Sequence, residues 1–256
     1  MKDILSGAQR HVLDEFVSSN VLLAFDYDGT LAPIVSDPDR AEMRKRTRGL
    51  LEELVEVYPV VVISGRAHAD VLRRVRGLNL AGVVGNHGIE RWHTAGTQVA
   101  EVEAWRQALQ AALAPLKGVT IEDKIYSIAV HYRRSRERKV ARAEILKAAA
   151  ALGDVRVIGG KQVVNILPKG APHKGIALER ERDRLGCDTA LYVGDDETDE
   201  DVFALDQPGR LLTIRVGPKR SSAASYCILD QRVLDRLLRA LIEIRSRQAR
   251  PRRAVQ

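Results

Sequence analysis

Residues 21–33 read VLLAFDYDGTLAP, and they carry the first strong structural signal in the chain. The first half is a continuous apolar run, which is typical of a strand buried on both faces of a parallel sheet. The run ends in Asp26 and Asp28, and the turn-forming residues Gly29 and Thr30 follow. In open α/β sheets, ligands bind outside the carboxyl ends of the strands. This stretch therefore predicts an α/β domain with a ligand site directly after residue 25.

The chain on the C-terminal side continues with alternating helical and strand-like segments. A charged helical stretch at about 39–57 precedes the apolar strand PVVVISGR at 59–66, and a helix at about 68–76 precedes LAGVVGNHG at 80–88. The alternation returns late in the chain as a helix at 173–185, a strand at 189–196, a short helix at 199–205, a strand at 211–217 and an amphipathic helix at 230–245. This pattern predicts a doubly wound parallel sheet, that is, a Rossmann-like α/β core.

The middle of the chain has a different pattern. A helix at 99–114 precedes two alternating strands within 119–134, and a helix at about 136–151 precedes a hairpin within 155–167 that we expect to turn on Gly159-Gly160. The breaker-rich flanks HTAG at 93–96 and PKGAP at 168–172 resemble a two-stranded hinge. We therefore predict a core formed by residues 1–93 and 171–256 and an inserted αββαββ domain formed by residues 94–170.

The charge balance suits an anionic ligand. The 256 residues include 41 Lys and Arg against 34 Asp and Glu, which gives a formal net charge of +7 and an isoelectric point near 9.6. Many of the basic residues lie among acids on predicted helices. The one uncompensated cluster, RSRQARPRR at 245–253, indicates a solvated tail. We therefore expect no nucleic-acid partner.

The cysteines and the apolar runs exclude several other classes of protein. Cys187 and Cys227 have no paired spacing for a metal and are expected to be reduced core residues. Residues 1–16 carry charges where a signal peptide needs apolar residues, and no apolar run approaches the ~18 residues of a membrane span. We expect a cytoplasmic monomer that has no membrane partner.

Four polar clusters lie at predicted strand ends or at a helix start. They are Asp26-Tyr27-Asp28-Gly29-Thr30, Ser64-Gly65-Arg66, His173-Lys174-Gly175 and Gly194-Asp195-Asp196. Any one of them is more simply a turn or a helix cap. Four such clusters at corresponding places of one sheet favour a functional site.

The residue types in these clusters indicate phosphoryl chemistry. If Asp26, Asp28 and Asp195 meet, each pair of charges repels by about 4 kcal/mol at about 4 Å and an effective dielectric near 20, so a cation is required. Because all of these ligands are hard oxygens, Mg²⁺ is the natural candidate. A carboxylate can attack phosphorus to give an aspartyl-phosphate, while Lys174, Ser64 and the metal stabilise the transferring oxygens.

The motifs in their order resemble those of the haloacid dehalogenase (HAD) phosphatase superfamily, and more closely those of the trehalose-6-phosphate phosphatases. The superfamily motifs are DYDGT, the Ser of ISGR, the Lys of HKG and GDDETDED; the closer ones are GNHGIE at 85–90, EDK at 122–124, HYR at 131–133 and GKQVVNILP at 160–168. The similarity extends from about residue 20 to about residue 230. It implies a Rossmann-like HAD core in which residues 94–170 form a C2-type cap.

The resemblance implies a role for each matching residue. Asp26 is the nucleophile and a metal ligand, and Asp28 is the general acid and base and binds Mg²⁺ through its backbone carbonyl. Ser64 and Lys174 hold the phosphoryl group, and Asp195 completes the metal site. Asp196 and Asp199 support the metal ligands without binding the metal themselves. The residues expected near the substrate are Thr30, Gly65, Arg66, His87, Glu122, Lys124, His131, Arg133 and Asn165.

Some of these substrate residues also have simpler interpretations. Glu122 with Lys124, and His131 with Arg133, share strand faces that suit a polyhydroxyl ligand, but cross-strand ion pairs on a solvated face would show the same pattern. Thr30 can be a helix cap, Arg66 can form a surface ion pair, and His87 can order its own loop. Asn165 stands where the resembling family typically has Glu, so a charge-assisted bond to the sugar would be lost there.

These inferences predict a Mg²⁺-dependent phosphatase that hydrolyses trehalose 6-phosphate to trehalose and inorganic phosphate through an aspartyl-phosphate. The alternatives within the enzyme class are a HAD phosphatase acting on sucrose phosphate, mannosyl-phosphoglycerate or a similar glycoside phosphate, and a sugar phosphomutase. A nucleic-acid-binding protein and a non-enzymatic sugar sensor are the alternatives outside that class.

Overall fold

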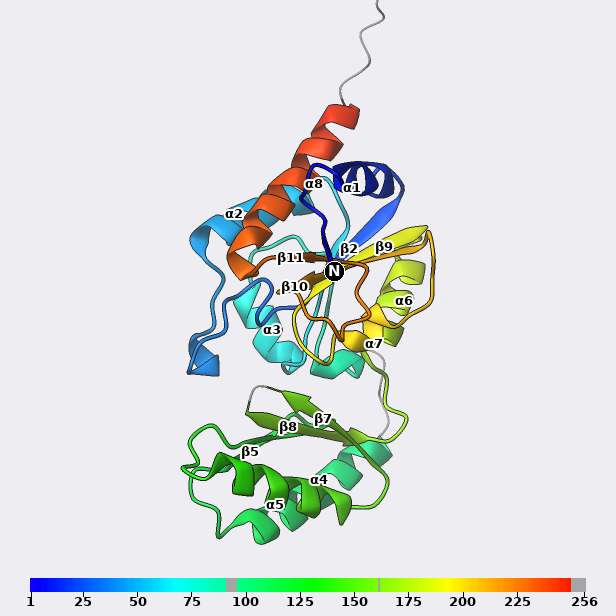
Figure 1. Cartoon of the computed structure of the whole chain (residues 1–256). Coiled ribbons are helices and arrows are strands. Elements are labelled where there is room, and N and C mark those ends of the chain that lie inside the picture. Colours follow the sequence, from blue (N-terminus) through cyan, green and yellow to red (C-terminus); the bar gives the residue numbers. More distant parts are fainter. Residues whose placement is uncertain (91–95, 161, 250–256) are drawn as a thin grey trace, which may run out of the picture.

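The computed structural model describes residues 1–90, 96–160 and 162–249. Two units are visible, each built around its own sheet (Figure 1). The larger unit, here called the core, contains both ends of the described chain. The smaller, here called the inserted unit, comprises the elements between residues 96 and 168. The α/β fold class predicted from the sequence is confirmed.

The core sheet has seven strands in the order β1-β11-β10-β9-β2-β3-β4, and all neighbouring strands are parallel. The strands are β1 (Lys2–Asp3), β2 (Val21–Phe25), β3 (Val60–Ile63), β4 (Gly82–Val84), β9 (Thr189–Gly194), β10 (Leu211–Val216) and β11 (Tyr226–Ile228). Every residue of β2 is buried, as its apolar sequence requires for a strand between β9 and β3. The polar residues that follow β2 therefore lie near the middle of the sheet edge.

Helices cover both faces of the core sheet. On one face the apolar side chains of α1 (Arg10–Phe16), α2 (Lys45–Val55), α3 (His68–Arg74) and α8 (Leu234–Ala249) pack against alternate residues of β2, among them Leu23 and Phe25. On the other face α6 (Lys174–Arg184) and α7 (Glu200–Phe203) pack against Leu22 and Ala24. Three short 3-10 helices lie at Pro38–Arg40, Asn86–Gly88 and Gln231–Val233. The layered arrangement buries both faces of the sheet, so the ends of the strands are the places open to a ligand.

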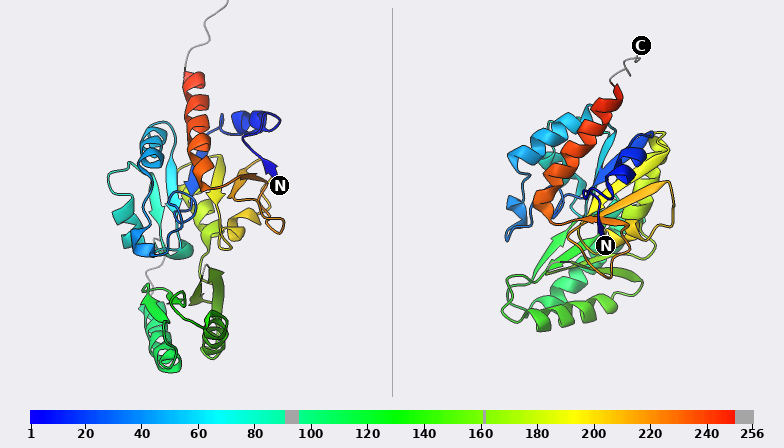
Figure 2. Two further views of the ribbon diagram at one scale, coloured as in Figure 1. Left: turned by 60° about the vertical axis from the view of Figure 1, so that its left-hand side comes forward. Right: turned by 45° about the horizontal axis from the view of Figure 1, so that its top comes forward.

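The inserted unit has the element order αββαββ that the sequence predicts. Its elements are α4 (Gly96–Leu113), β5 (Thr120–Asp123), β6 (Ile128–His131), α5 (Arg138–Ala150), β7 (Val155–Gly160) and β8 (Val163–Pro168). The strands form an antiparallel sheet in the order β5-β6-β8-β7. The two helices cover the outer face of this sheet, and the other face is turned toward the core (Figure 2).

The predicted hairpin turn on Gly159-Gly160 is wrong. Both glycines lie within β7, where they pair with Val164 and Val163, and the chain turns after them, with Gln162 at a φ of 64°. A Cβ on Gly160 would lie 2.7 Å from Val163 Cγ1. Glycine is therefore required here for the close approach of two strands rather than for the turn.

Other details of the fold were not predicted from the sequence. The strands β1 and β11 and the helix α1 are additions to the predicted core, and β1 pairs with β11 although more than 200 residues separate them. Cys187 and Cys227 are buried free cysteines, as expected. No helix within the described ranges has the length and apolar character needed to cross a bilayer. The domain limits at 93/94 and 170/171 stay predictions, since most of the expected HTAG hinge lies outside the described residues.

Candidate active site

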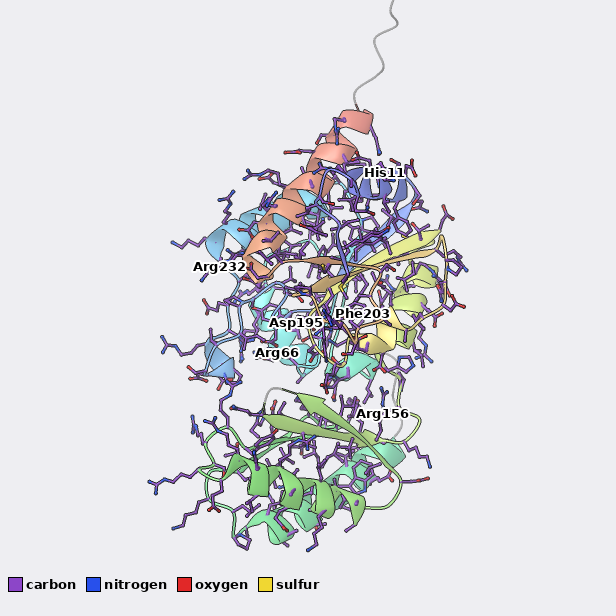
Figure 3. The ribbon with its side chains drawn as sticks, in the orientation of Figure 1. His11, Arg66, Arg156, Asp195, Phe203 and Arg232 are labelled. Carbon is purple, nitrogen blue, oxygen red and sulfur yellow. The ribbon has the colours of Figure 1, made fainter. Side chains whose placement is uncertain are left out.

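The four predicted clusters meet at the edge of the core that faces the inserted unit. Asp26 follows β2, Ser64 follows β3 and Asp195 follows β9, which are adjacent parallel strands, and Lys174 is the first residue of α6. The carboxyl ends of parallel neighbours necessarily lie at one edge of a sheet. Figure 3 shows Asp195 and Arg66 at this edge.

A buried lysine joins two of the predicted aspartates. Lys174 Nζ lies 3.0 Å from Asp26 Oδ1 and 2.7 Å from Asp199 Oδ1. All three side chains are at most 5% exposed. An ion pair held out of water in this way interacts far more strongly than one at the surface.

The electrostatics of this group show an excess of negative charge. Burial raises the pKa of Asp26 well above its usual range, and the charge of Lys174 offsets this only in part because Asp199 shares the same ammonium. Burial alone would lower the pKa of Lys174, but the carboxylates of Asp199 and Asp26 outweigh it and raise that pKa. Two carboxylates around one cation leave a place that a further cation would stabilise.

Asp199 is the central acceptor of the site. Its Oδ1 accepts hydrogen bonds from Lys174 Nζ at 2.7 Å and from the Tyr192 hydroxyl at 2.6 Å. Its Oδ2 accepts from the backbone N–H groups of Asp195 at 2.7 Å and Asp196 at 2.9 Å. Asp199 thus positions both Lys174 and the loop between β9 and α7, residues 195–199, which we call the acidic loop.

The carboxylates of the site fit a hard divalent cation. Oxygens of Asp26, Asp195 and Asp199 lie within 4.8 Å of one another. The Asp195 carboxylate packs on Gly29, where a Cβ would lie 2.2 Å from its Oδ2, and Gly29 has a φ of +83° that favours glycine. Because protein donors already engage both oxygens of Asp199, Asp26 and Asp195 are the better ligands. An all-oxygen set of this kind suits Mg²⁺.

Asp28 does not point into this carboxylate group. Its two oxygens accept a bidentate pair of hydrogen bonds from Arg66, with Nε at 2.6 Å and Nη2 at 2.7 Å. Arg66 also donates to Asp70 at 2.7 Å and to the Pro38 carbonyl at 2.8 Å. In this structure Arg66 therefore forms an ion pair, which was the simpler of its two interpretations. Its partner is Asp28, the residue that the resemblance assigns as the general acid and base.

The remaining core residues surround the same edge. Ser64 is buried directly after β3, the strand that pairs with β2, and the ring of His87 packs on Gly65, where a Cβ would lie 2.4 Å from His87 Cε1. Thr30 is fully buried, and its Oγ1 has no hydrogen-bond partner among the described residues. Asp196 accepts from Thr198 N–H at 2.8 Å and from Thr198 Oγ1 at 2.7 Å, which shapes the acidic loop.

The strand register places the predicted sugar residues on the face of the inserted sheet toward the core. Glu122 pairs with Ala129, and Ala129 pairs with Asn165, so these three residues form one row across the sheet. Their neighbours Ile128, Val130, Val164 and Ile166 point the other way into the apolar cluster under the helices. His131 Nε2 lies 2.7 Å from Glu122 Oε2.

Charged contacts bridge the inserted unit and the core. Lys124 Nζ donates to the Gly65 carbonyl at 2.8 Å, next to Arg66. Arg133 Nη1 donates to the carbonyls of Val35 at 2.9 Å and Ser36 at 2.6 Å. In this structure Arg133 therefore contacts the loop of the core that follows β2, here called the core loop. Arg156, which Figure 3 shows on the side toward the core, donates to both oxygens of Asp201 at 2.7 Å.

Among the described residues, Tyr192, Asn86 and Arg215 contact the candidate site and were not predicted from the sequence. Tyr192 donates to Asp199, Asn86 Nδ2 donates to the Lys124 carbonyl at 3.0 Å, and Arg215 contacts the acidic loop. The signal for Tyr192 and Arg215 was a large polar side chain in a mostly apolar strand. Asn86 stands beside His87 in the GNHGIE motif at 85–90.

The buried His87 predicts a pH dependence of stability. Burial lowers the pKa of His87 well below its usual range, and the charges of Lys124 and Lys174 act in the same direction. Only the unfolded chain therefore gains a proton here as the pH falls below about 6.5, and stability is lost at up to about 1.4 kcal/mol per pH unit. When the pH falls from about 7.5 to about 5.5, the free energy of unfolding of His87→Gln should decrease by about 1 kcal/mol less than that of the unsubstituted protein. Urea unfolding at the two pH values measures this difference. Equal losses in both proteins would contradict this prediction.

The order of the core strands and the position of the aspartates define a member of the haloacid dehalogenase class of folds. The family model described as trehalose-phosphatase matches residues 24–226, which is more than half of the chain. The chain belongs to the trehalose-phosphatase family.

Individual relatives agree with this assignment. The trehalose-phosphate phosphatase of Mycobacterium ulcerans is 36% identical over 194 residues, which cover 70% of this chain and 50% of that protein. The trehalose 6-phosphate phosphatase RA3 of Zea mays is 29% identical over 251 residues, covering 86% and 69%. The chain therefore spans about half the length of the mycobacterial relative.

A solved structure shows the same architecture. The C-terminal domain of Candida albicans trehalose-6-phosphate phosphatase superposes with a TM-score of 0.78 and 25% sequence identity. The match covers 91% of this chain and 96% of that domain. The likeness therefore extends over both the core and the inserted unit.

Proposed function

We propose that this protein is a Mg²⁺-dependent phosphatase that hydrolyses trehalose 6-phosphate to trehalose and inorganic phosphate. The observation that carries the proposal is Asp26, a buried carboxylate that lies 3.0 Å from Lys174 directly after β2, with the acidic loop of Asp195 beside it. The names of the relatives support the substrate, and the carboxylate geometry supports the chemistry.

Asp26 and Asp28 divide the chemistry between them. An Asp26 oxygen attacks phosphorus, and the bond from phosphorus to the sugar oxygen breaks while Asp28 gives that oxygen a proton. Water then attacks the aspartyl-phosphate and gives its proton to Asp28, which releases phosphate and restores both side chains. Because Arg66 holds both oxygens of Asp28 here, this pair opens before Asp28 carries a proton.

Other residues hold the phosphoryl group and the cation. Lys174 and Ser64 bind the phosphoryl oxygens, and Thr30 contributes a buried hydroxyl that has no hydrogen-bond partner among the described residues. Asp26, Asp195 and the backbone carbonyl of Asp28 would hold Mg²⁺, and Asp199 and Asp196 shape the loop that carries Asp195. When bound, Mg²⁺ neutralises the charge that develops on the transferring group.

Residues 94–170 form the cap that recognises the sugar. The face with Glu122, Lys124, His131 and Asn165 is turned toward the catalytic edge, and Lys124 already reaches the Gly65 carbonyl. Gly65, Arg66 and His87 form the core side of this contact, and Arg133 holds the cap edge to the core loop. Such a cap excludes water while it positions the substrate.

Phosphate release from a panel of sugar phosphates, with Mg²⁺ and with excess chelator, tests the proposal. Metal-dependent release that is fastest from trehalose 6-phosphate is the expected result. Faster release from sucrose phosphate or mannosyl-phosphoglycerate would keep the chemistry and change the substrate, with Asn165 the first residue to examine. An isomerised sugar phosphate without free phosphate would indicate a mutase instead.

Glu122→Ala should separate sugar recognition from chemistry. Burial would raise the pKa of Glu122, but the hydrogen bond with His131 and the charge of Lys124 outweigh it and lower that pKa, so the residue offers a carboxylate acceptor. Its loss should reduce kcat/KM for trehalose 6-phosphate by about 10- to 100-fold. Hydrolysis of a small aryl phosphate should be spared, and Glu144→Ala, an exposed position on α5, is the control. Equal losses on both substrates would count against the cap assignment.

The monomeric state, the cytoplasmic location and the absence of a nucleic-acid partner stay predictions from the sequence. Gel filtration and a salt titration of nucleic-acid binding address the first and the third of these. Binding that falls steeply with salt and persists in Asp26→Asn would indicate a nucleic-acid partner.

A further inference from the structure

Arg215 is a buried arginine that the proposed chemistry does not use. It lies near the end of β10, and its register partner across the sheet is Gly194, the residue immediately before Asp195. Only 6% of Arg215 is exposed. An arginine in a buried strand needs several acceptors, because an unpaired guanidinium is costly there.

The acceptors of Arg215 belong to the acidic loop. Nη1 donates to the Asp196 carbonyl at 3.1 Å and to Glu200 Oε1 at 2.8 Å, and Nη2 donates to the Asp195 carbonyl. Glu200 is fixed in turn, because its Oε2 accepts from the Ala223 N–H at 2.9 Å. The guanidinium therefore connects the loop after β9 to the segment after β10.

The backbone N–H and C=O groups of Asp195 and Asp196 are all hydrogen-bonded. The N–H groups of Asp195 and Asp196 donate to Asp199, while their carbonyls accept from Arg215. This arrangement leaves the backbone that carries the Asp195 carboxylate little freedom to move. Groups behind the metal ligands commonly orient them in this way.

We propose that Arg215 is a positioning residue for the Mg²⁺ site, acting through the backbone of Asp195 and Asp196. This inference rests on the proposed metal-dependent function. Charge repulsion from Arg215 toward the cation is a weaker effect, because Glu200 neutralises the guanidinium at 2.8 Å. Loss of Arg215 is therefore expected to weaken Mg²⁺ binding rather than to strengthen it.

A Mg²⁺ titration of Arg215→Met tests the proposal with two readouts. The first is the rise in Tm with Mg²⁺ in the absence of any substrate, and the second is the Mg²⁺ dependence of phosphate release. The half-saturating Mg²⁺ concentration should increase by about 10- to 100-fold in both. Arg215→Lys should fall between this variant and the unsubstituted protein, because a lysine keeps the charge but not the forked geometry.

Arg182→Met is the matched control. Arg182 is 5% exposed, and its Nη1 donates to Gln207 Oε1 at 2.6 Å near the end of α6, so its removal also costs a buried arginine. Its Mg²⁺ half-saturation should stay unchanged even where its Tm falls. If the half-saturating Mg²⁺ concentrations of Arg215→Met and Arg215→Lys also equal that of the unsubstituted protein, the proposal is overturned. If the unsubstituted protein shows no Mg²⁺ response at all, the metal-dependent function itself fails, and this inference fails with it.

Discussion

Asp26→Asn is expected to lower phosphate release by about 10⁴-fold or more, because it removes the proposed nucleophile. The amide has nearly the shape of the carboxylate but is a poor nucleophile, so the loss should appear in kcat. Release of phosphate in single-turnover and steady-state assays measures it. Activity close to that of the unsubstituted protein would mean that the covalent mechanism is wrong.

The same substitution should not destabilise the metal-free fold. Burial raises the pKa of Asp26 well above its usual value of about 3.9, so the charged form is unfavourable in the folded state. A raised folded pKa means that the stabilising contribution is present below the unfolded pKa and is lost as the pH rises through the folded pKa.

In chelator, the Tm of Asp26→Asn should therefore equal or exceed that of the unsubstituted protein, by more at neutral than at acidic pH. Asp154→Asn, at an exposed position, is the control and should show no such trend. A lower Tm for Asp26→Asn at neutral pH would contradict the charge argument.

Lys174→Met is expected to reduce the free energy of unfolding by about 3–5 kcal/mol and to remove activity as well. It leaves Asp26 and Asp199 buried without their shared cation, while Tyr192 also donates to Asp199. The methionine side chain fills a similar volume, so the loss reports charge rather than packing. Urea unfolding in chelator measures the stability, and added Mg²⁺ should recover part of it because a cation returns to the same carboxylates.

Lys169→Met provides a matched comparison. Lys169 Nζ lies 2.8 Å from Asp154 Oδ1, a distance close to the 2.7 Å between Lys174 and Asp199, but its side chain is 68% exposed. Water screens this surface pair, so its removal should leave the free energy of unfolding essentially unchanged. Similar losses in the two variants would show that burial does not set the strength of the Lys174 contacts.

The core and the candidate catalytic cluster follow from local features of the sequence. The apolar run of β2 ends directly at Asp26, and the same strand-to-polar transition occurs at Ser64 and Asp195. Each of these patterns lies within a few consecutive residues, and parallel strands place their carboxyl ends together whatever the side chains are. The αββαββ order of the inserted unit is predictable for the same reason, since hydrophobic periodicity is local.

Contacts between distant segments depend on how the helices and strands pack against one another, and local sequence patterns do not predict that packing. Arg66 could have met substrate or an ion-pair partner, and the packing of α3 and the loop after β2 brings it to Asp28. Gly160 resembles a turn residue until the register places it against Val163. Arg215 reaches Asp195 only because β10 pairs in parallel with β9. Strand register and side-chain direction are set by the burial of the whole core, which is a property of the folded chain.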